Sequence, residues 1–177
     1  MSQAQEAGRV LLFTGEGKGK TTAALGMALR ACGHGMRVLV LQFIKAAITG
    51  EVTAAQNLPG CEFVQSGRGF MPQPDSPHFE EHARAAMAGL ERAAQALLSG
   101  MYEILILDEI CVAVDAGLLT EENVVALLQK RPPGLTVVLT GRGATPRLAA
   151  LADTVTEMRC VKHALNEGRH AQKGVEF

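Results

Sequence analysis

The sequence predicts an α/β fold: a mostly parallel sheet of six strands, covered by helices on both faces. Short apolar runs alternate along the chain with longer segments of helical periodicity, the order that builds parallel sheets from strand–helix–strand units. Hydrophobic residues make up 47% of the 177 residues and charged residues only 20%, so the chain can bury a sizeable core. This length predicts one domain over residues 1–177, with residues 1–8 flexible.

The first half of the predicted sheet begins with an apolar strand over residues 10–13, which a glycine-rich turn joins to a helix over residues 21–32. A Gly-His-Gly sequence at residues 33–35 ends this helix, because glycine readily adopts the left-handed cap conformation. Residues 37–43 are almost all apolar, as in the central strands of parallel sheets. A weaker strand is expected over residues 62–65.

The second half follows a loop at residues 67–77, which holds two glycines and three prolines. The longest helix is expected over residues 78–98, where small and apolar residues recur every three or four positions on one face. The remaining elements continue the alternation and are expected at residues 104–107 (strand), 121–129 (helix), 135–140 (strand), 145–152 (helix) and 154–159 (strand).

Composition argues against several classes of protein. The 17 Lys and Arg balance 18 Asp and Glu, whereas nucleic-acid binding favours a basic excess, and with no Trp and one Tyr few side chains can stack on bases. The N-terminus shows no signal peptide, and no apolar run approaches the roughly 20 residues of a membrane helix. The four cysteines form no CxxC pair, so no zinc or redox motif is visible. We therefore expect a cytoplasmic protein that binds neither nucleic acid nor membranes.

The clearest functional signal is the run Thr-Gly-Glu-Gly-Lys-Gly-Lys-Thr-Thr at residues 14–22, between a predicted strand and a predicted helix. Its three glycines let the backbone turn tightly, so that N–H groups face a polyphosphate. Lys20 supplies a positive charge for the phosphates and Thr21 a hydroxyl for Mg²⁺. The strict P-loop pattern has Gly where this chain has Thr14. A glycine-rich turn with incidental lysines is the alternative, and the strand–loop–helix setting disfavours it.

A second acidic element supports a nucleotide site. The apolar strand at residues 104–107 is followed by Asp108 and Glu109, the form expected of an Mg²⁺-binding strand beside a P-loop. Ligands of such sheets bind at the carboxyl ends of the strands, where these two side chains would lie. We predict an ATP site with Mg²⁺, or Mn²⁺ in its place, held by Thr21, Asp108 and Glu109.

A possible zinc motif is interpreted differently. His78, Glu81 and His82 match the H-x-x-E-H pattern of some zinc proteases. They follow Ser76-Pro77 at the acidic first turn of the long predicted helix, and no third ligand is identifiable. We expect a charged helix start rather than a metal site.

Residues 13–26 resemble the opening of the ATP:corrinoid adenosyltransferases, also called cob(I)alamin or cob(I)yrinic acid a,c-diamide adenosyltransferases. The resemblance covers nearly the whole chain, and its most specific parts are Gln-Phe-Ile-Lys at residues 42–45 and the closing segment at residues 171–177. That family also carries Thr at the position of Thr14. Further matching segments lie at residues 33–35, 50–51, 69–70, 107–109, 131–132, 139–142, 152–158 and 162–164.

The resemblance implies an enzyme that moves the 5′-deoxyadenosyl group of ATP onto the Co(I) of a reduced corrinoid and releases triphosphate. It further implies a RecA-like sheet, a homodimer, and a separate reductase or flavodoxin-type flavoprotein as electron donor. Cobalt is a nucleophile that needs no deprotonation, so the main task is to stabilise charge on the leaving triphosphate. Lys20, Thr21 and Glu109 are the expected catalytic residues. The expected nucleotide-binding residues are Gly15, Glu16, Gly17, Lys18, Gly19, Lys20, Thr21, Thr22, Lys45, Glu51 and Arg142.

The chain departs from the family in two places. Where the family has a Trp two residues after the Phe of Gly-Phe, this chain has Pro72, which leaves Phe70 as the expected corrinoid contact. We also expect this chain to lack the N-terminal helix that covers the nucleotide in longer forms of the family.

Two other functions stay open at this point. A different small P-loop kinase or ATPase would release ADP and orthophosphate. A non-catalytic, ATP-gated corrinoid carrier is favoured by the missing Trp.

Overall fold

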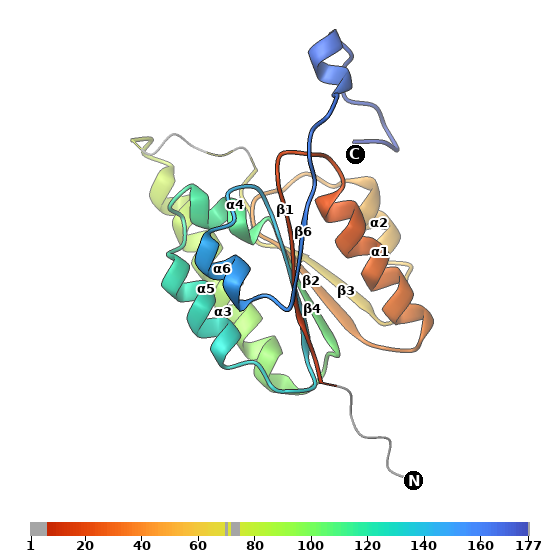
Figure 1. The fold of residues 1–177 in the computed structure, drawn as a ribbon, viewed down its shortest axis with the longest axis vertical. Coiled ribbons are helices and arrows are strands. Elements are labelled where there is room, and N and C mark those ends of the chain that lie inside the picture. Colours follow the sequence, from red (N-terminus) through yellow and green to blue (C-terminus); the bar gives the residue numbers. More distant parts are fainter. Residues whose placement is uncertain (1–6, 70, 72–74, 177) are drawn as a thin grey trace.

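The computed structural model describes residues 7–69, 71 and 75–176. Its sheet has six strands in the order β3-β2-β4-β5-β1-β6, and all neighbouring strands are parallel (Figure 1). The strands are β1 (Val10–Thr14), β2 (Val38–Gln42), β3 (Cys61–Gln65), β4 (Ile104–Asp108), β5 (Thr136–Thr140) and β6 (Thr154–Glu157). The predicted α/β fold class is confirmed, and the sheet is fully rather than mostly parallel.

Helices cover both faces of this sheet. Figure 1 shows α1 on one side and α3, α4, α5 and α6 on the other, while α2 contacts the edge strand β3. The helices are α1 (Lys20–Gly33), α2 (Gly50–Ala55), α3 (Phe79–Ser99), α4 (Ile110–Asp115), α5 (Glu121–Gln129), α6 (Pro146–Leu151) and the 3₁₀ helix η1 (Ala164–Glu167). The sequence did not predict α2, α4 and η1, because fewer than two turns show no readable periodicity.

The central strands divide their side chains between two cores. On β4, Leu105 and Leu107 pack toward α3, α4, α5 and α6, whereas Ile104 and Ile106 pack toward α1. The buried residues of α1 are all alanines, Ala24, Ala28 and Ala31. These small side chains let α1 lie close to the sheet, which holds the start of the helix at the end of β1.

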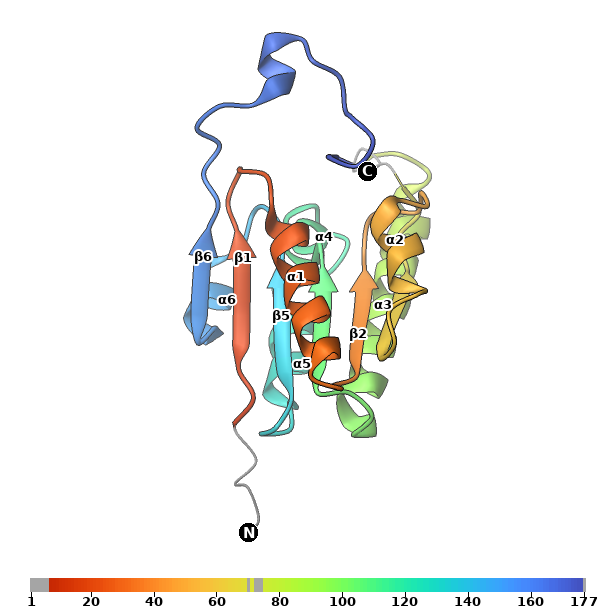
Figure 2. The same cartoon turned by 90° about the vertical axis from the view of Figure 1, so that its right-hand side faces the viewer.

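The parallel arrangement brings the functional segments to one edge of the sheet. β1, β2, β4 and β5 all end there, and the connection from β1 to α1 passes over that edge (Figure 2). β6 ends at Glu157, two residues earlier than predicted, and residues 158–176 rise above the same edge and turn back over it. Every helix among the described residues is too short or too polar to cross a membrane.

Core packing can be tested with a matched pair of leucines. Leu107 on β4 is 0% exposed, whereas Leu98 on α3 is 65% exposed. We expect Leu107→Ala to lower the free energy of unfolding by about 2–5 kcal/mol, because it leaves a cavity in the core. The control, Leu98→Ala, should change it by less than about 0.5 kcal/mol. Urea unfolding followed by circular dichroism measures both, and equal effects would contradict the assignment of β4 to the core.

Candidate active site

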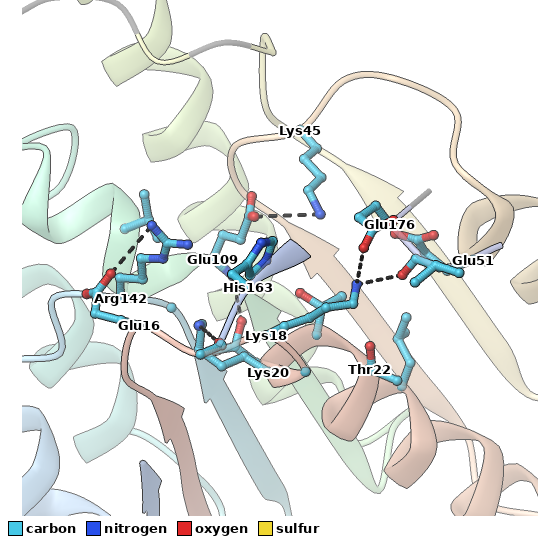
Figure 3. A pocket seen from close by; sticks show the side chains of 18 of the residues that line it. Glu16, Lys18, Lys20, Thr22, Lys45, Glu51, Glu109, Arg142, His163 and Glu176 are labelled. Atoms are coloured by element: carbon cyan, nitrogen blue, oxygen red, sulfur yellow. Dashed lines mark hydrogen bonds and ion pairs between the residues drawn. The ribbon is translucent and has the colours of Figure 1, made fainter. Parts of the chain in front are cut away.

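The glycine-rich turn after β1 forms a P-loop whose lysine lies folded onto the loop itself. Gly15 and Gly19 have φ angles of 92° and 112°, a region that glycine enters without steric cost. The Lys20 ammonium donates to the carbonyl oxygens of Gly15 and Gly17 at 2.7 and 2.6 Å (Figure 3). Burial lowers the pKa of Lys20, and the positive charge of Arg142 adds to this effect. The ammonium is thus held at the loop by two neutral acceptors, which an anionic ligand can replace.

Two P-loop glycines are also required by packing against the segment that follows β6. A Cβ on Gly15 would lie 2.5 Å from the Met158 carbonyl oxygen, and a Cβ on Gly17 2.7 Å from the same atom. The Gly17 N–H donates to that oxygen at 2.6 Å, and the Met158 N–H donates to the Thr14 carbonyl at 2.8 Å. Residue 158 therefore rests directly on the P-loop backbone.

Asp108 at the end of β4 is a buried carboxylate held by three neutral donors. It is 1% exposed and accepts hydrogen bonds from Thr21 Oγ1 at 2.9 Å, Thr140 Oγ1 at 2.7 Å and Gln42 Nε2 at 2.9 Å. Gln42 stands opposite Asp108 in the pairing of β2 with β4. Its side-chain oxygen accepts in turn from Gln65 Nε2 at 2.8 Å. Asp108 lies beneath Thr21 and fixes the orientation of that hydroxyl.

Glu109 adopts a backbone conformation that is rare for residues with a side chain. Its φ of 64° is the only positive value for a non-glycine residue in the described part of the chain, and its N–H donates to Thr140 Oγ1 at 2.9 Å. Oε1 lies 3.7 Å from the Lys45 ammonium, whereas Oε2 is buried and forms no hydrogen bond with the described residues. Burial raises the pKa of Glu109, and Lys45 is the main opposing influence. Such backbone strain costs about 1–3 kcal/mol and gathers at functional sites.

A cavity of about 700 Å³ opens above these groups. Its walls come from the P-loop, the start of α1, the segments after β2, β4 and β5, the start of α2, His163 and residues 174–176. The predicted residues that line it are Glu16, Gly17, Lys18, Gly19, Lys20, Thr21, Thr22, Lys45, Glu51, Glu109 and Arg142. Gly15 and Asp108 are not among its lining residues, while Phe70 and Pro72 lie outside the described residues.

Two of the positively charged residues predicted to bind the nucleotide, Lys18 and Arg142, are engaged in other contacts in this structure. Lys18 Nζ donates to the Val175 carbonyl at 2.5 Å and lies 3.7 Å from a Glu176 carboxylate oxygen, so it extends away from Lys20 (Figure 3). Arg142 lies 3.5 Å from Glu16 in an exposed ion pair.

Sequence reasoning missed part of the cavity wall. His163, Gly174, Val175 and Glu176 line the cavity from the C-terminal side, and Thr140 lines it from β5. The segments around residues 163 and 171–177 were noted for their resemblance to a family, but nothing in them indicated a position beside the P-loop. Contacts between residues about 150 positions apart leave no local pattern.

The H-x-x-E-H segment forms a helix start, as predicted. α3 begins directly after His78, and Glu81 pairs with Arg68 at 3.6 Å. Within residues 7–69, 71 and 75–176, no three His, Cys, Asp or Glu side chains are grouped so that they could hold a metal ion by themselves.

The fold and the site together define a P-loop nucleotide-binding protein of the RecA-like α/β type. A glycine-rich loop joins a parallel strand to a helix that begins with Lys20 and Thr21, and a buried aspartate from another strand holds Thr21. The model of the family described as "ATP:corrinoid adenosyltransferase BtuR/CobO/CobP" matches residues 6–177, and the chain belongs to this family. It is therefore a transferase whose substrates are ATP and a corrinoid.

Individual relatives agree with the family match. A "Corrinoid adenosyltransferase" of Pseudomonas aeruginosa is 44% identical over 174 residues, which cover 97% of this chain and 85% of that protein. The "Corrinoid adenosyltransferase CobA" of Salmonella typhimurium is 39% identical over 178 residues, covering 100% of this chain and 90% of the relative. A "Corrinoid adenosyltransferase" of Escherichia coli is 40% identical with the same coverage.

The raised pKa of Glu109 predicts a pH-dependent stability effect in the nucleotide-free protein. A carboxyl whose folded-state pKa is raised binds its proton more tightly when folded, so its ionisation above the ordinary pKa favours unfolding. We expect Glu109→Gln to have a higher melting temperature than the wild type at neutral pH. The difference should shrink as the pH falls through the ordinary range of a carboxyl. Thermal unfolding from pH 4 to pH 8 tests this, with the exposed Glu91→Gln on α3 as control. A destabilised Glu109→Gln at neutral pH would contradict the expectation.

Proposed function

We propose that the cavity binds ATP with its triphosphate on the P-loop, and that the protein transfers the 5′-deoxyadenosyl group to the Co(I) of a reduced corrinoid. The observation that carries this proposal is the convergence of a P-loop, Lys20, Thr21 and Glu109 on one cavity. Triphosphate leaves as a unit in this reaction. The main contribution of the protein is then to stabilise the negative charge that grows on the leaving group.

Lys20 is proposed as the central cation of the phosphate site. Its ammonium now rests on two backbone carbonyls, and phosphate oxygens would replace these as stronger, charged acceptors. The start of α1 follows directly, so the positive end of a 14-residue helix faces the same anion. Lys45 and Arg142 line the cavity and add positive charge, whereas Glu16 and Glu51 are proposed to border the nucleotide.

The site also fits Mg²⁺ or Mn²⁺ bound together with ATP. Mg²⁺ usually takes one or two protein oxygens and completes its shell with phosphates and water, so a protein cluster of three ligands is not required. Glu109 offers a buried Oε2 without a partner among the described residues, and Thr21 lines the same cavity. These two side chains would hold the ion, with Asp108 orienting Thr21 from below. The bound ion would supply charge neutralisation on the phosphates.

The corrinoid half of the site is proposed from the family resemblance. Co(I) is already a strong nucleophile, so Glu109 has no proton to remove. Phe70 is proposed to contact the corrinoid, with Pro72 at the position of the family Trp, and both lie outside the described residues.

We further propose one domain, a homodimer, a cytoplasmic location and a separate flavoprotein or reductase as electron donor. One sheet containing all the described strands supports a single domain. β6 lies at the edge of that sheet with all four residues exposed, and edge strands offer backbone groups to a second chain. The four cysteines are free thiols, as expected in a reducing compartment. The electron donor rests on the resemblance alone.

An anaerobic assay with ATP, Mg²⁺ and chemically reduced cobalamin tests the proposed reaction. Formation of adenosylcobalamin, followed by its visible spectrum, with one inorganic triphosphate released per turnover is the expected result. ADP and orthophosphate without adenosylcobalamin would instead indicate a kinase or ATPase. Corrinoid binding without any product would indicate a carrier.

Replacing the P-loop lysine should nearly abolish this activity. We expect Lys20→Ala to lower the rate by about 10²–10³-fold, the typical cost of losing one charge-stabilising contact to a leaving group. The fold should persist, because Lys20 contacts only loop carbonyls through its ammonium. The control is Lys130→Ala, an exposed lysine at the end of α5. Steady-state kinetics and thermal unfolding of both variants provide the measurement, and near wild-type turnover in Lys20→Ala would reject the assignment.

A further inference from the structure

The segment after β6 begins and ends on the P-loop. We call residues 158–176 the tail loop. Its first residue, Met158, accepts the Gly17 N–H and donates to the Thr14 carbonyl. Near its other end, the Val175 carbonyl accepts from Lys18 Nζ, and Glu176 lies 3.7 Å from the same ammonium. The tail loop therefore closes over the phosphate side of the cavity with both ends fastened (Figures 1 and 2).

His163 sits inside the tail loop with a defined ring orientation. It directly precedes η1 and caps it, because its Nδ1 accepts a hydrogen bond from the Leu165 N–H at 3.2 Å. A ring nitrogen that accepts a hydrogen bond carries no proton. The neutral imidazole must then carry its proton on Nε2. The cap thus makes His163 a hydrogen-bond donor at Nε2.

The His163 ring borders the cavity over the P-loop. It lines the same space as Lys20 and Thr21 (Figure 3). Nε2 forms no hydrogen bond with another described residue. His163 is half-buried, and it also borders a second, smaller cavity that Lys18, Val175 and Glu176 share with the first. A donor on this ring therefore lies beside the P-loop.

We propose that His163 contacts the nucleotide, with its Nε2–H donating a hydrogen bond to an oxygen of the triphosphate in ATP and in the departing product. This assignment rests on the proposed binding of ATP in the cavity. A triphosphate fits this donor because it offers acceptor oxygens in every direction, and Lys20 and Lys45 line the same space. A donor fixed by the η1 cap stabilises growing negative charge without having to reorient during the reaction.

Two substitutions separate this contact from the capping role of the same side chain. In His163→Asn, the Asn side-chain oxygen takes the place of Nδ1 and keeps the cap on Leu165, but no donor reaches the position of Nε2. In His163→Gln, the longer amide offers an N–H near the position of Nε2, and the cap is lost. His170→Asn is the control, because it changes another histidine of the tail loop, an exposed one that does not line the cavity.

The experiment is titration calorimetry of the full chain with inorganic triphosphate, ATP and adenosine in the presence of Mg²⁺. We expect His163→Asn to weaken binding of inorganic triphosphate and ATP by about 10- to 100-fold, as for a lost hydrogen bond to a charged group. His163→Gln should lose less affinity than His163→Asn. Adenosine, which lacks phosphates, should bind equally to all variants, and His170→Asn should behave as wild type.

Three results would overturn the assignment of His163. Wild-type affinity of His163→Asn for inorganic triphosphate would show that Nε2 makes no contact. A greater loss in His163→Gln than in His163→Asn would show that only the cap matters. Weaker adenosine binding in His163→Asn would place the ring at the nucleoside instead. Because no corrinoid is present, a wild-type protein that binds triphosphate through His163 but fails to transfer the adenosyl group would reject only the proposed function.

Discussion

The buried carboxylate of Asp108 is the interaction on which the arrangement of this site depends. A charge that is 1% exposed is stable only if hydrogen bonds replace its water shell, and here the donors come from β2, β5 and α1. The donors are all neutral, so none of these positions holds a second buried charge. The same three bonds therefore satisfy Asp108 and set the relative positions of the strand ends and the P-loop helix. If any one of the three donors moved away, the buried carboxylate would lose a hydrogen bond. Such a loss destabilises the fold more than the loss of an ordinary surface contact.

The hydrogen bonds of Asp108 continue through the hydroxyl of Thr140 and through the side-chain amides of Gln42 and Gln65. Thr140 donates to Asp108 and accepts the Glu109 N–H, so one hydroxyl both satisfies the buried charge and holds the strained backbone that directs Glu109. On the other side, the Gln42 side-chain oxygen accepts a hydrogen bond from the Gln65 amide. The same amide also donates to the Ala47 carbonyl at 3.0 Å. That second bond reaches the loop that carries Lys45. One connected set of hydrogen bonds thus reaches the backbone of Glu109 and the loop that carries Lys45, and the charged groups of these two residues lie 3.7 Å apart.

The P-loop is constrained from above as well as from below. Its glycines are usually explained by the approach of phosphate to the backbone, but Gly15 and Gly17 lack room for a Cβ because Met158 occupies that space. The close contact ties the start of the tail loop to the phosphate site without any side chain. Lys18 then binds Val175 and Glu176 at the far end of the tail loop, so in this structure the lysine stabilises that part of the cavity wall. The P-loop and the cavity wall above it are consequently built from segments far apart in the chain.

Local patterns in the sequence were sufficient for the strands, the helices α1, α3, α5 and α6, the P-loop and the acidic end of β4, because each depends on residues that are close together in the chain. Lys45, Glu51 and Arg142 were among the expected nucleotide-binding residues, and the parallel sheet brings all three to the cavity. The short helices α2, α4 and η1 were missed because six or four residues give too little periodicity, whereas the equally short α6 carries a Thr cap and a proline in its first turn. Only the tertiary structure decided the strand order, the three donors to Asp108, the direction of Lys18 and the place of His163 beside the P-loop. The physical reason is distance along the chain: Lys18 and Val175 are 157 residues apart, and a hydrogen bond over such a separation is set by packing of the whole fold.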